Sequence, residues 1–460
     1  MHFQPFYLGC LAHASYLVGD GGEAVIIDPQ RDVDQYLAEA ASRGLVIRHV
    51  VETHLHADFV SGHLELAART GAAIWLGPGS GASFAHRVAR DGDEIRVGGL
   101  VLRFLETPGH TPESISVLLL DGATAAPQKV FTGDALFVGD VGRPDLVASR
   151  GFSPAEMASM LYNSLHDKLL ALPDEVEVWP AHGAGSLCGR AIGAERSTTI
   201  GVQRRSNWAL ADMSREQFIE QVTSALPPAP AYFQHDAALN RLGAQPLADL
   251  APPVRLAPAE VAAGGTLVLD VRDASAWAAG HVPGSLNIGL RGAFASWAGT
   301  LVPVDAPIVL VAADRDGEHE ARMRLARVGI ERVVGTLLID DWRDAGLPLA
   351  SVPQLEAREL ARLARSSGIA VIDVRRPAEY AAAHIPGAVN LPVDELGARL
   401  GELDPARPVA VACAGGYRSA AAAGILERAG FTVAADLAGG TTAWLAAGLP
   451  VERAGAAEAA

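Results

Sequence analysis

Apolar runs alternate with amphipathic segments through residues 1–250. Runs rich in Val, Ile and Leu predict buried strands, whereas apolar residues spaced three and four apart predict helices. The predicted strands are Ala24–Ile27, Val46–Val51, Ala73–Leu76, Leu100–Leu105, Ser116–Leu120, Val130–Phe131 and Val176–Trp179. The predicted helices include Val33–Arg43 and Ser61–Thr70. This alternation indicates an α/β fold, and in such folds the chemistry usually lies where strand ends open into loops.

The rest of the chain contains an internal repeat with a period of about one hundred residues, so each copy is expected to be a domain. The repeated pairs are Leu267–Asp273 with Val371–Arg376, His281–Asn287 with His384–Asn390, and Trp342 with Trp444. Each copy has two apolar runs that predict strands, and the second precedes a helical stretch; these runs are Leu267–Val271 and Ile308–Ala313, then Ala370–Val374 and Val409–Ala412. Strands that alternate with helices predict a parallel sheet covered on both faces.

The length of 460 residues is too great for one ordinary hydrophobic core. Pro-containing stretches at 251–253 and 351–353 are typical of linkers. We therefore expect three domains and a flexible tail; they cover residues 1–250, 254–350, 354–452 and 453–460.

The composition is that of a globular protein, with 49% hydrophobic and 20% charged residues. A net charge of −16 argues against nucleic acid as the main partner. The N-terminus shows no signal-peptide pattern, and no apolar stretch is long enough to cross a bilayer. The three cysteines, Cys10, Cys188 and Cys413, are too few for a disulfide framework. A cytoplasmic location is therefore expected, where a lone cysteine in a suggestive setting is more often reactive.

Four short polar segments follow predicted strands in the first 250 residues. They contain His54, His56 and Asp58, then His110, then Asp134, and finally His182. A single histidine is more often structural than ligating. An ordered set of His and Asp at successive strand ends is different, because it turns several metal ligands toward one cavity. The sequence therefore predicts a metal site.

This ordered set, over roughly residues 1–240, resembles the metallo-β-lactamase superfamily, whose fold is an αββα sandwich. Most hydrolases of that superfamily continue the pattern with a histidine after the aspartate and bind two metals. Here that position is Phe59, which cannot ligate a metal. The resemblance with this departure favours a mononuclear site.

Within the superfamily the likeness is greatest to the persulfide dioxygenases. That resemblance implies one Fe(II) per chain, held by His54, His110 and Asp134. Such a triad leaves positions open for O2 and for a thiolate-like sulfur. The other residues of the pattern would orient the ligands or a metal-bound water without binding the metal themselves; they are His56, Asp58 and His182.

Four further residues are weaker candidates. Arg143 lies in a Gly-Arg-Pro-Asp segment that also matches the family, and it either anchors a carboxylate, positions its loop or has no role. The segment 180–189 resembles the bacterial multidomain sulfide-detoxification branch. Its Cys188 either faces the substrate channel or is a small buried thiol, and the same alternatives hold for Cys10. Tyr16 is a candidate substrate contact.

The loop Cys413–Ser419 follows the predicted strand Val409–Ala412 and opens a predicted helix, Ser419–Ala429. Backbone N–H groups of such a loop converge on its centre, and the helix N-terminus adds positive potential, so the thiolate is favoured. Arg418 can pair with an anionic sulfur species. The other candidate contacts of the bound sulfur are Gly415, Gly416, Tyr417 and Ser419.

Three further segments match this loop to the rhodanese family, which carries sulfur as a cysteine persulfide; they are Asp373–Arg375, Glu379 and His384–Gly387. The alternative without a catalytic role is a buried cysteine beside a Gly-rich turn. Related phosphatases have one more residue between Cys and Arg, so the four residues between Cys413 and Arg418 favour sulfur transfer.

The middle copy keeps the scaffold without the nucleophile. Aligning Pro307 with Pro408 places Ala312 opposite Cys413 and Gly317 opposite the arginine. This copy cannot form a cysteine persulfide, so we expect it to be a structural bridge or a binding surface.

Together these patterns predict oxidation of a low-molecular-weight persulfide with O2 to sulfite. The rhodanese would either supply the persulfide or convert sulfite and persulfide to thiosulfate. The carrier thiol is glutathione, coenzyme A or another, and a homo-oligomer is compatible with the superfamily. The alternatives are a zinc thioester hydrolase of the glyoxalase II kind and a non-catalytic sulfur-binding or sensor protein.

Overall fold

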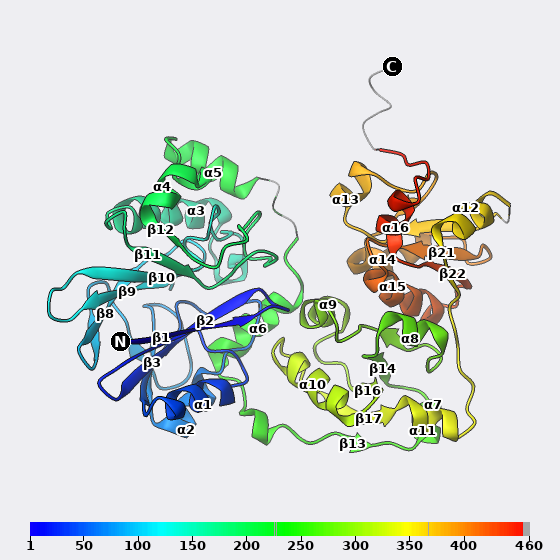
Figure 1. Cartoon of the computed structure of the whole chain (residues 1–460), viewed down its shortest axis with the longest axis horizontal. Coiled ribbons are helices and arrows are strands. Elements are labelled where there is room, and N and C mark those ends of the chain that lie inside the picture. Colours follow the sequence, from blue (N-terminus) through cyan, green and yellow to red (C-terminus); the bar gives the residue numbers. More distant parts are fainter. Residues whose placement is uncertain (225, 227, 367, 454–460) are drawn as a thin grey trace. The chain divides into compact units, whose positions relative to one another are not determined.

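The computed structural model describes residues 1–224, 226, 228–366 and 368–453. The chain forms two compact units (Figure 1). The first comprises Met1–Leu250 and Leu325–Ile330, and the second comprises Ala251–Arg324 and Glu331–Ala460. Most of the expected tail at 453–460 lies outside the described residues.

Two six-stranded sheets build the first unit. One sheet runs in the order β1 (His2–Leu8), β2 (His13–Asp20), β3 (Glu23–Ile27), β4 (Val46–Val51), β5 (Ala73–Leu76) and β6 (Arg87–Val88). The other runs in the order β12 (Thr198–Thr199), β11 (Glu177–Pro180), β10 (Pro127–Gly133), β9 (Ile115–Asp121), β8 (Leu100–Glu106) and β7 (Glu94–Val97). The pairs β3–β4, β4–β5, β5–β6 and β10–β11 are parallel, and the other neighbouring strands are antiparallel.

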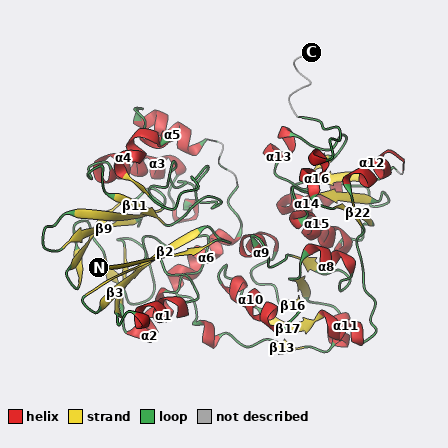
Figure 2. Cartoon of the chain, in the orientation of Figure 1, coloured by secondary structure: helices red, strands yellow, loops and turns green. Residues whose placement is uncertain are grey.

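Helices cover the outer faces of both sheets (Figure 2). The α-helices are α1 (Asp34–Ser42), α2 (His63–Thr70), α3 (Pro154–Asn163), α4 (Ile200–Ser206), α5 (Arg215–Thr223) and α6 (Tyr232–Leu242). Short helices lie at Ala148–Arg150, Ser164–Leu169, Trp208–Leu210 and Leu247–Asp249. Both α3 and α5 begin with a capping box, at Ser153 and Ser214, that satisfies their first backbone N–H groups.

Alternate residues of a strand face opposite layers of this unit. On β2, Tyr16 and Val18 pack between the two sheets, whereas Leu17 packs outward beneath α1 with Tyr36. On the far side, Phe218 of α5 belongs to the core that covers the second sheet. Helix, sheet, sheet and helix therefore form the expected αββα sandwich.

The second unit contains two five-stranded sheets in which every pairing is parallel. The first has the order β13 (Val254–Arg255), β17 (Val333–Leu338), β16 (Ile308–Ala312), β14 (Leu267–Asp270) and β15 (Leu286–Asn287). The second has the order β18 (Gln354–Leu355), β22 (Val433–Leu437), β21 (Val409–Ala412), β19 (Ala370–Asp373) and β20 (Val389–Asn390). The identical strand order confirms that the repeated sequences fold alike.

Helices connect these strands. In the first copy they are α7 (Pro258–Ala262), α8 (Ala274–Ala279), α9 (Phe294–Leu301), α10 (Arg315–Ala326) and α11 (Ile339–Asp344). In the second copy they are α12 (Ala357–Ser366), α13 (Pro377–Ala382), α14 (Val393–Arg399), α15 (Tyr417–Arg428) and α16 (Gly440–Ala446), with a short helix at Leu400–Glu402.

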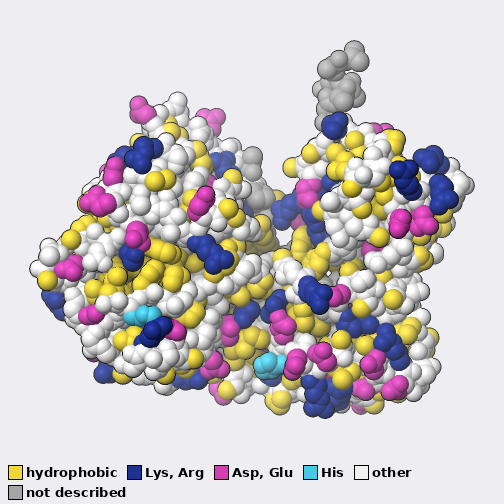
Figure 3. Space-filling model, in the orientation of Figure 1, with side chains coloured by type: hydrophobic (Ala, Val, Ile, Leu, Met, Phe, Trp, Pro, Cys, Tyr) yellow, Lys and Arg dark blue, Asp and Glu magenta, His cyan; other side chains and the backbone are white. Residues whose placement is uncertain are grey.

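The predicted strands are confirmed to within three residues at each end. The helix expected at Ser61–Thr70 begins at His63, and the one expected at Ser419–Ala429 begins at Tyr417. Among the described residues, the strands that were not predicted are β1, β2, β6, β7 and β12 in the first unit and β13, β15, β17, β18, β20 and β22 in the second. No helix in the described part of the chain is long and apolar enough to span a membrane. Basic and acidic side chains are interspersed on the face shown in Figure 3.

Candidate functional site

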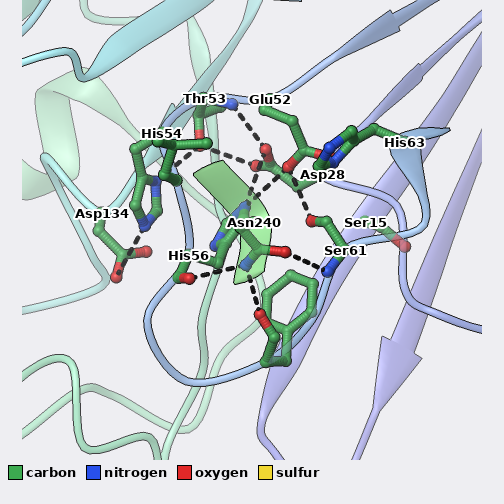
Figure 4. Close-up of polar contacts among 12 residues, drawn as sticks. Ser15, Asp28, Glu52, Thr53, His54, His56, Ser61, His63, Asp134 and Asn240 are labelled. Atoms are coloured by element: carbon green, nitrogen blue, oxygen red, sulfur yellow. Dashed lines mark hydrogen bonds and ion pairs between the residues drawn. The ribbon is translucent and has the colours of Figure 1, made fainter. Parts of the chain in front are cut away.

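Three of the predicted residues meet in one buried cluster. His54 follows β4, His110 follows β8, and Asp134 follows β10. The Nε2 atoms of His54 and His110 lie 3.8 Å and 3.4 Å from Oδ2 of Asp134. One ligand atom from each of the three residues lies within 4.8 Å of the others. Figure 4 shows the imidazole of His54 directed toward the carboxylate of Asp134.

The polar atoms that face one another here have no hydrogen-bond partner among the described residues. They are Nε2 of His54, Nε2 of His110 and both carboxylate oxygens of Asp134, all of them buried. A buried polar atom without a partner is costly, and native structures almost always satisfy it. Two imidazole nitrogens and a carboxylate that converge in this way fit a transition-metal ion.

Both histidines are held in the tautomer that a metal requires. Nδ1 of His110 lies 2.9 Å from the backbone oxygen of Arg143, which can only accept, so Nδ1 carries the proton. Thr53 donates its hydroxyl to Oδ2 of Asp28 at 2.9 Å, so the same hydroxyl accepts from Nδ1 of His54 at 3.0 Å. In each ring the lone pair is therefore on Nε2, the atom that faces Asp134.

Asp28 anchors this arrangement from the end of β3. Its Oδ1 also accepts the backbone N–H of Thr53 at 2.7 Å. Its φ of +52° lies in the left-handed region, which Asp tolerates better than most residues. Gly133, with φ +52°, lies so close that a Cβ there would sit 2.5 Å from the Thr53 hydroxyl oxygen. Only glycine fits that position without displacing the threonine.

The remaining predicted residues of the pattern form a second group beside the triad. His56, Asp58 and His182 each place a ligand atom within 4.8 Å of the other two. Nε2 of His182 lies 3.5 Å from Asp58 and 3.6 Å from Asp134. The ring of Phe59 packs 4.4 Å from that of His56. An apolar ring thus occupies the place where a second metal would need a further ligand.

His56 differs from its neighbours in charge. Its Nε2 lies 3.2 Å from Asp28 and 3.4 Å from Glu52. Burial alone would lower the pKa of His56, but these two carboxylates raise it well above its usual value. Burial, together with the neighbouring histidines, lowers the pKa of His54 well below its usual value. His54 is therefore neutral and able to ligate, whereas His56 favours the protonated form and supports Asp28.

Cys188 lies beside the predicted metal ligands. The sequence did not decide between this position and a buried thiol elsewhere. The Cys188 thiol forms a further potential ligand group with Asp134 and His182. Burial, and then the charges of Asp58 and Asp134, raise the pKa of Cys188 well above its usual value. The thiol is therefore protonated in the absence of a cation. Cys10 is only partly buried.

Arg143 and Tyr16 take different places from those expected of substrate contacts. The guanidinium of Arg143 is buried and forms two 2.7 Å hydrogen bonds with Asp145. The backbone of Arg143 supports His110, as described above, so loop positioning is the alternative that the geometry favours. Tyr16 lies in the core between the sheets and donates its hydroxyl to the Pro180 carbonyl. This placement gives no support to a substrate contact by Tyr16.

Asn240 is a site residue that the sequence did not reveal. Its amide donates to the carbonyl oxygens of His56 at 2.8 Å and Phe59 at 2.7 Å, and it accepts the N–H of Ser61 at 2.8 Å (Figure 4). One side chain from α6 thus fixes the loop that carries the metal ligands. His13 is also buried here, with its ring 4.0 Å from that of Phe59. No motif distinguishes either residue, because each acts through contacts distant in sequence.

The predicted sulfur-carrying loop lies in the second unit. Cys413 directly follows β21, and its buried Sγ accepts the backbone N–H of Gly416 at 3.1 Å. Ser419 Oγ lies 3.5 Å from the same sulfur. Gly416 has φ +99°, a conformation that favours glycine. The loop therefore directs a backbone N–H at the sulfur, and the thiol in turn donates to the hydroxyl oxygen of Ser419.

Arg418 pairs with Glu379 in this structure. Two hydrogen bonds of 2.7 and 2.8 Å join the guanidinium to the carboxylate. The same bonds raise the pKa of Arg418 and lower the pKa of Glu379. The arginine is thus held in one orientation at the start of α15.

The middle copy lacks both partners of that pair. Backbone hydrogen bonds of 2.9 Å, from Val271 to Val311 and from Val374 to Ala412, occupy equivalent positions in the two copies. This register confirms Ala312 opposite Cys413. It also places Gly317 opposite Arg418 and Ala276 opposite Glu379. The copies share the bidentate pair of the Asp-Val-Arg motif, which is thereby structural.

Comparison with known proteins gives the same division of the chain. The model of the metallo-beta-lactamase superfamily matches residues 8–182. The model of the rhodanese-like domain matches residues 256–337 and 356–447. The fold and the site thus define a metallo-beta-lactamase domain followed by two rhodanese-like domains.

Individual relatives identify the family within the metallo-beta-lactamase superfamily. The chain is 34% identical over 187 residues to "Persulfide dioxygenase ETHE1, mitochondrial" of Bos taurus, covering 40% of this chain and 68% of the relative. It is 36% identical over 172 residues to the protein of the same name of Homo sapiens, covering 36% of this chain and 63% of the relative. A solved metallo-beta-lactamase structure from Staphylococcus aureus subsp. aureus COL has 34% identity and a TM-score of 0.66, covering 73% of this chain and 98% of that chain. The chain belongs to the persulfide dioxygenase ETHE1 family and carries two rhodanese-like domains in addition.

Proposed function

We propose that the chain oxidises a low-molecular-weight persulfide with O2 and transfers sulfane sulfur through Cys413. The observation that carries the first half is the buried cluster of His54, His110 and Asp134, whose facing atoms have no hydrogen-bond partner among the described residues. The names of the curated relatives support the same activity. The balanced reaction is RSSH + O2 + H2O → RSH + HSO3⁻ + H⁺, in which the sulfane sulfur gives four electrons to O2.

In this proposal His54, His110 and Asp134 hold one Fe(II). Bound Fe(II) would supply the redox centre and the open coordination positions that O2 and a thiolate-like sulfur require. Asp28 and Thr53 keep the Nε2 lone pair of His54 available, and the Arg143 carbonyl does the same for His110. Phe59 keeps the neighbouring position apolar, which favours a single metal ion.

The second half of the proposal is sulfur transfer by Cys413. Its thiolate attacks the outer sulfur of thiosulfate; an S–S bond forms, the S–S bond of thiosulfate breaks, and sulfite leaves. An acceptor thiolate then removes the sulfur and regenerates Cys413. The Gly416 N–H, directed at Sγ, stabilises the negative charge on sulfur at each stage. In reverse, the same steps convert sulfite and a persulfide to thiosulfate.

Coupling between the two activities follows from their chemistry, because sulfite is a product of the first and a leaving group in the second. We further propose a reducing compartment such as the cytoplasm, since none of the three cysteines, all of them among the described residues, forms a disulfide.

Metal analysis tests the first half most simply. Protein purified without added metal is expected to contain about one iron per chain. His110→Ala is expected to contain none, because only two of the three ligands of the cluster remain. His166→Ala is the matched control, since this histidine of the same unit lies outside the cluster. Stoichiometric zinc with thioester hydrolysis would instead support a hydrolase.

A further inference from the structure

The middle rhodanese-like copy contacts the sulfur-carrying loop of the last copy directly. The hydroxyl of Tyr417, four residues after Cys413, donates to the backbone oxygen of Gly289 at 2.7 Å. A Cβ added at Gly292 would lie 3.3 Å from the Tyr417 ring, so the backbone there lies close to the tyrosine. Both glycines belong to the segment that follows β15 in the middle copy.

This contact continues along the whole of α15. A Cβ at Gly424 would lie 2.6 Å from the carbonyl oxygen of Ser285, so helix and middle copy approach backbone to backbone. At the far end, Glu427 lies 2.9 Å from Nε2 of His281. Tyr417 and Gly424 are seven residues apart and therefore lie on one face of the helix. That face is the one that meets the middle copy.

The repeat shows what the middle copy has changed. His281 and His384 occupy equivalent positions, and each stacks on the aromatic ring four residues before it, at 3.8 and 3.7 Å. Nε2 of His384 faces Glu452 of its own copy at 3.6 Å. Nε2 of His281 instead faces Glu427 of the other copy. In the copy without a nucleophile, the equivalent histidine, His281, thus contacts α15, the helix that begins within the Cys413 loop.

The start of the loop is held within its own copy, because the carbonyls of Cys413 and Ala414 accept the N–H groups of Thr441 and Thr442 at 2.7 and 3.1 Å. The centre of the loop is more open. A Cβ at Gly415 or Gly416 would meet no atom within 4 Å. The Gly416 N–H that points at Sγ immediately precedes Tyr417, so a displacement of the tyrosine would pass directly to the residue that carries this N–H. A tether at Tyr417 therefore controls the geometry around the sulfur more strongly than it would in a densely packed loop.

We infer that the middle rhodanese-like copy is a positioning partner of the last one: through Gly289, Gly292 and the face of α15, it holds the Cys413 loop in the form that accepts sulfane sulfur. This inference rests on the proposed sulfur transfer by Cys413. It gives Tyr417 a positioning role, and it gives the copy without a nucleophile a function in the transfer step.

The test compares two glycines of the middle copy in the full chain. Gly292→Ala adds a methyl group against Tyr417, whereas Gly265→Ala adds one at a similarly positive φ, +92° against +112°, where nothing lies within 4 Å. Both variants carry comparable backbone strain, and neither residue touches the sulfur. Gly292→Ala is expected to lower kcat/KM for thiosulfate about three- to tenfold, the range of one hydrogen bond, and Gly265→Ala to leave it unchanged.

Tyr417→Phe removes only the hydroxyl and is expected to lower kcat/KM by the same about three- to tenfold. The double variant Tyr417→Phe with Gly292→Ala should be little worse than either single one, because both disturb one contact. Persulfide-dependent O2 uptake should be unchanged in all of them. Equal losses in Gly292→Ala and Gly265→Ala, or full transfer activity in Tyr417→Phe, would overturn the inference.

Amide hydrogen exchange of residues 413–419 supplies a readout that does not depend on activity. Gly292→Ala should accelerate exchange in this loop and Gly265→Ala should not. If the unaltered chain shows no Cys413-dependent sulfur transfer, the proposed function fails, and the exchange rates still decide whether the middle copy holds the loop.

Discussion

Thr53→Val removes one hydroxyl at nearly constant volume and is predicted to weaken metal binding. That hydroxyl lies 3.0 Å from Nδ1 of His54 and donates to Asp28 at 2.9 Å. Without it the Nδ1 proton of His54 faces a methyl group in a fully buried site, and the ring loses the partner that fixes its tautomer and orientation. Loss of such a partner typically costs about 10- to 100-fold in metal affinity.

A 10- to 100-fold loss corresponds to about 1.4 to 2.8 kcal/mol of binding free energy. Anaerobic competition between the protein and a chelator, with Fe(II) or Co(II), measures this difference directly. Thr107→Val is the matched control, because its buried hydroxyl bonds only to that of Ser116, at 3.0 Å, among the interactions that the structure describes. Unchanged affinity in Thr53→Val would refute the tautomer argument, and an equal loss in Thr107→Val would indicate a general packing effect.

Three further predictions concern the second unit. Cys413→Ser should abolish sulfur transfer yet leave O2 uptake with an added persulfide intact, because the two sites lie in separate units; loss of O2 uptake would instead demand obligatory transfer. Ala312→Cys with Gly317→Arg should give little sulfur transfer, since the middle copy also has Ala276 in place of a carboxylate partner and acidic residues in its loop; transfer that survives Cys413→Ser would contradict this. Burial raises the pKa of Asp436 to about 6. A carboxyl with a raised folded-state pKa loses stability as pH rises, here from about 4 to 6, so Asp436→Asn should gain up to roughly 3 kcal/mol at pH 8 and nothing at pH 4. Urea titrations at both pH values check the sign.

Strands such as β16 and β21 were predicted because they are continuous, fully buried apolar runs. It missed β2 (His13–Asp20), which contains His, Ser and Tyr and is buried on both faces, so its residues show no simple alternation. It missed β1, whose pairing with β2 is a tertiary contact rather than a local pattern. The repeat fixed the architecture of the second unit, since two copies of one pattern had to share one fold.

Residues of the metal site were predictable where a motif places them directly after a strand, as with His54 and Asp134. Asp28 and Asn240 were not, because each reaches the ligand loop from a distant part of the chain. The direction of the Tyr16 side chain was not predictable for a related reason: proximity in sequence to Cys10 does not show which way a strand residue faces. In the structure Tyr16 faces the core between the sheets.

O2 consumption by the iron-loaded chain with a defined persulfide, with sulfite measured in the same samples, tests the proposed oxidation. One O2 should be consumed per sulfite formed, and Asp134→Ala should show no uptake, because His54 and His110 then lack the carboxylate that completes the cluster. Thr107→Val should consume O2 at the unaltered rate. Thioester hydrolysis by the zinc-loaded chain, without O2 uptake by the iron-loaded one, would show that the domain is a hydrolase and not a persulfide dioxygenase.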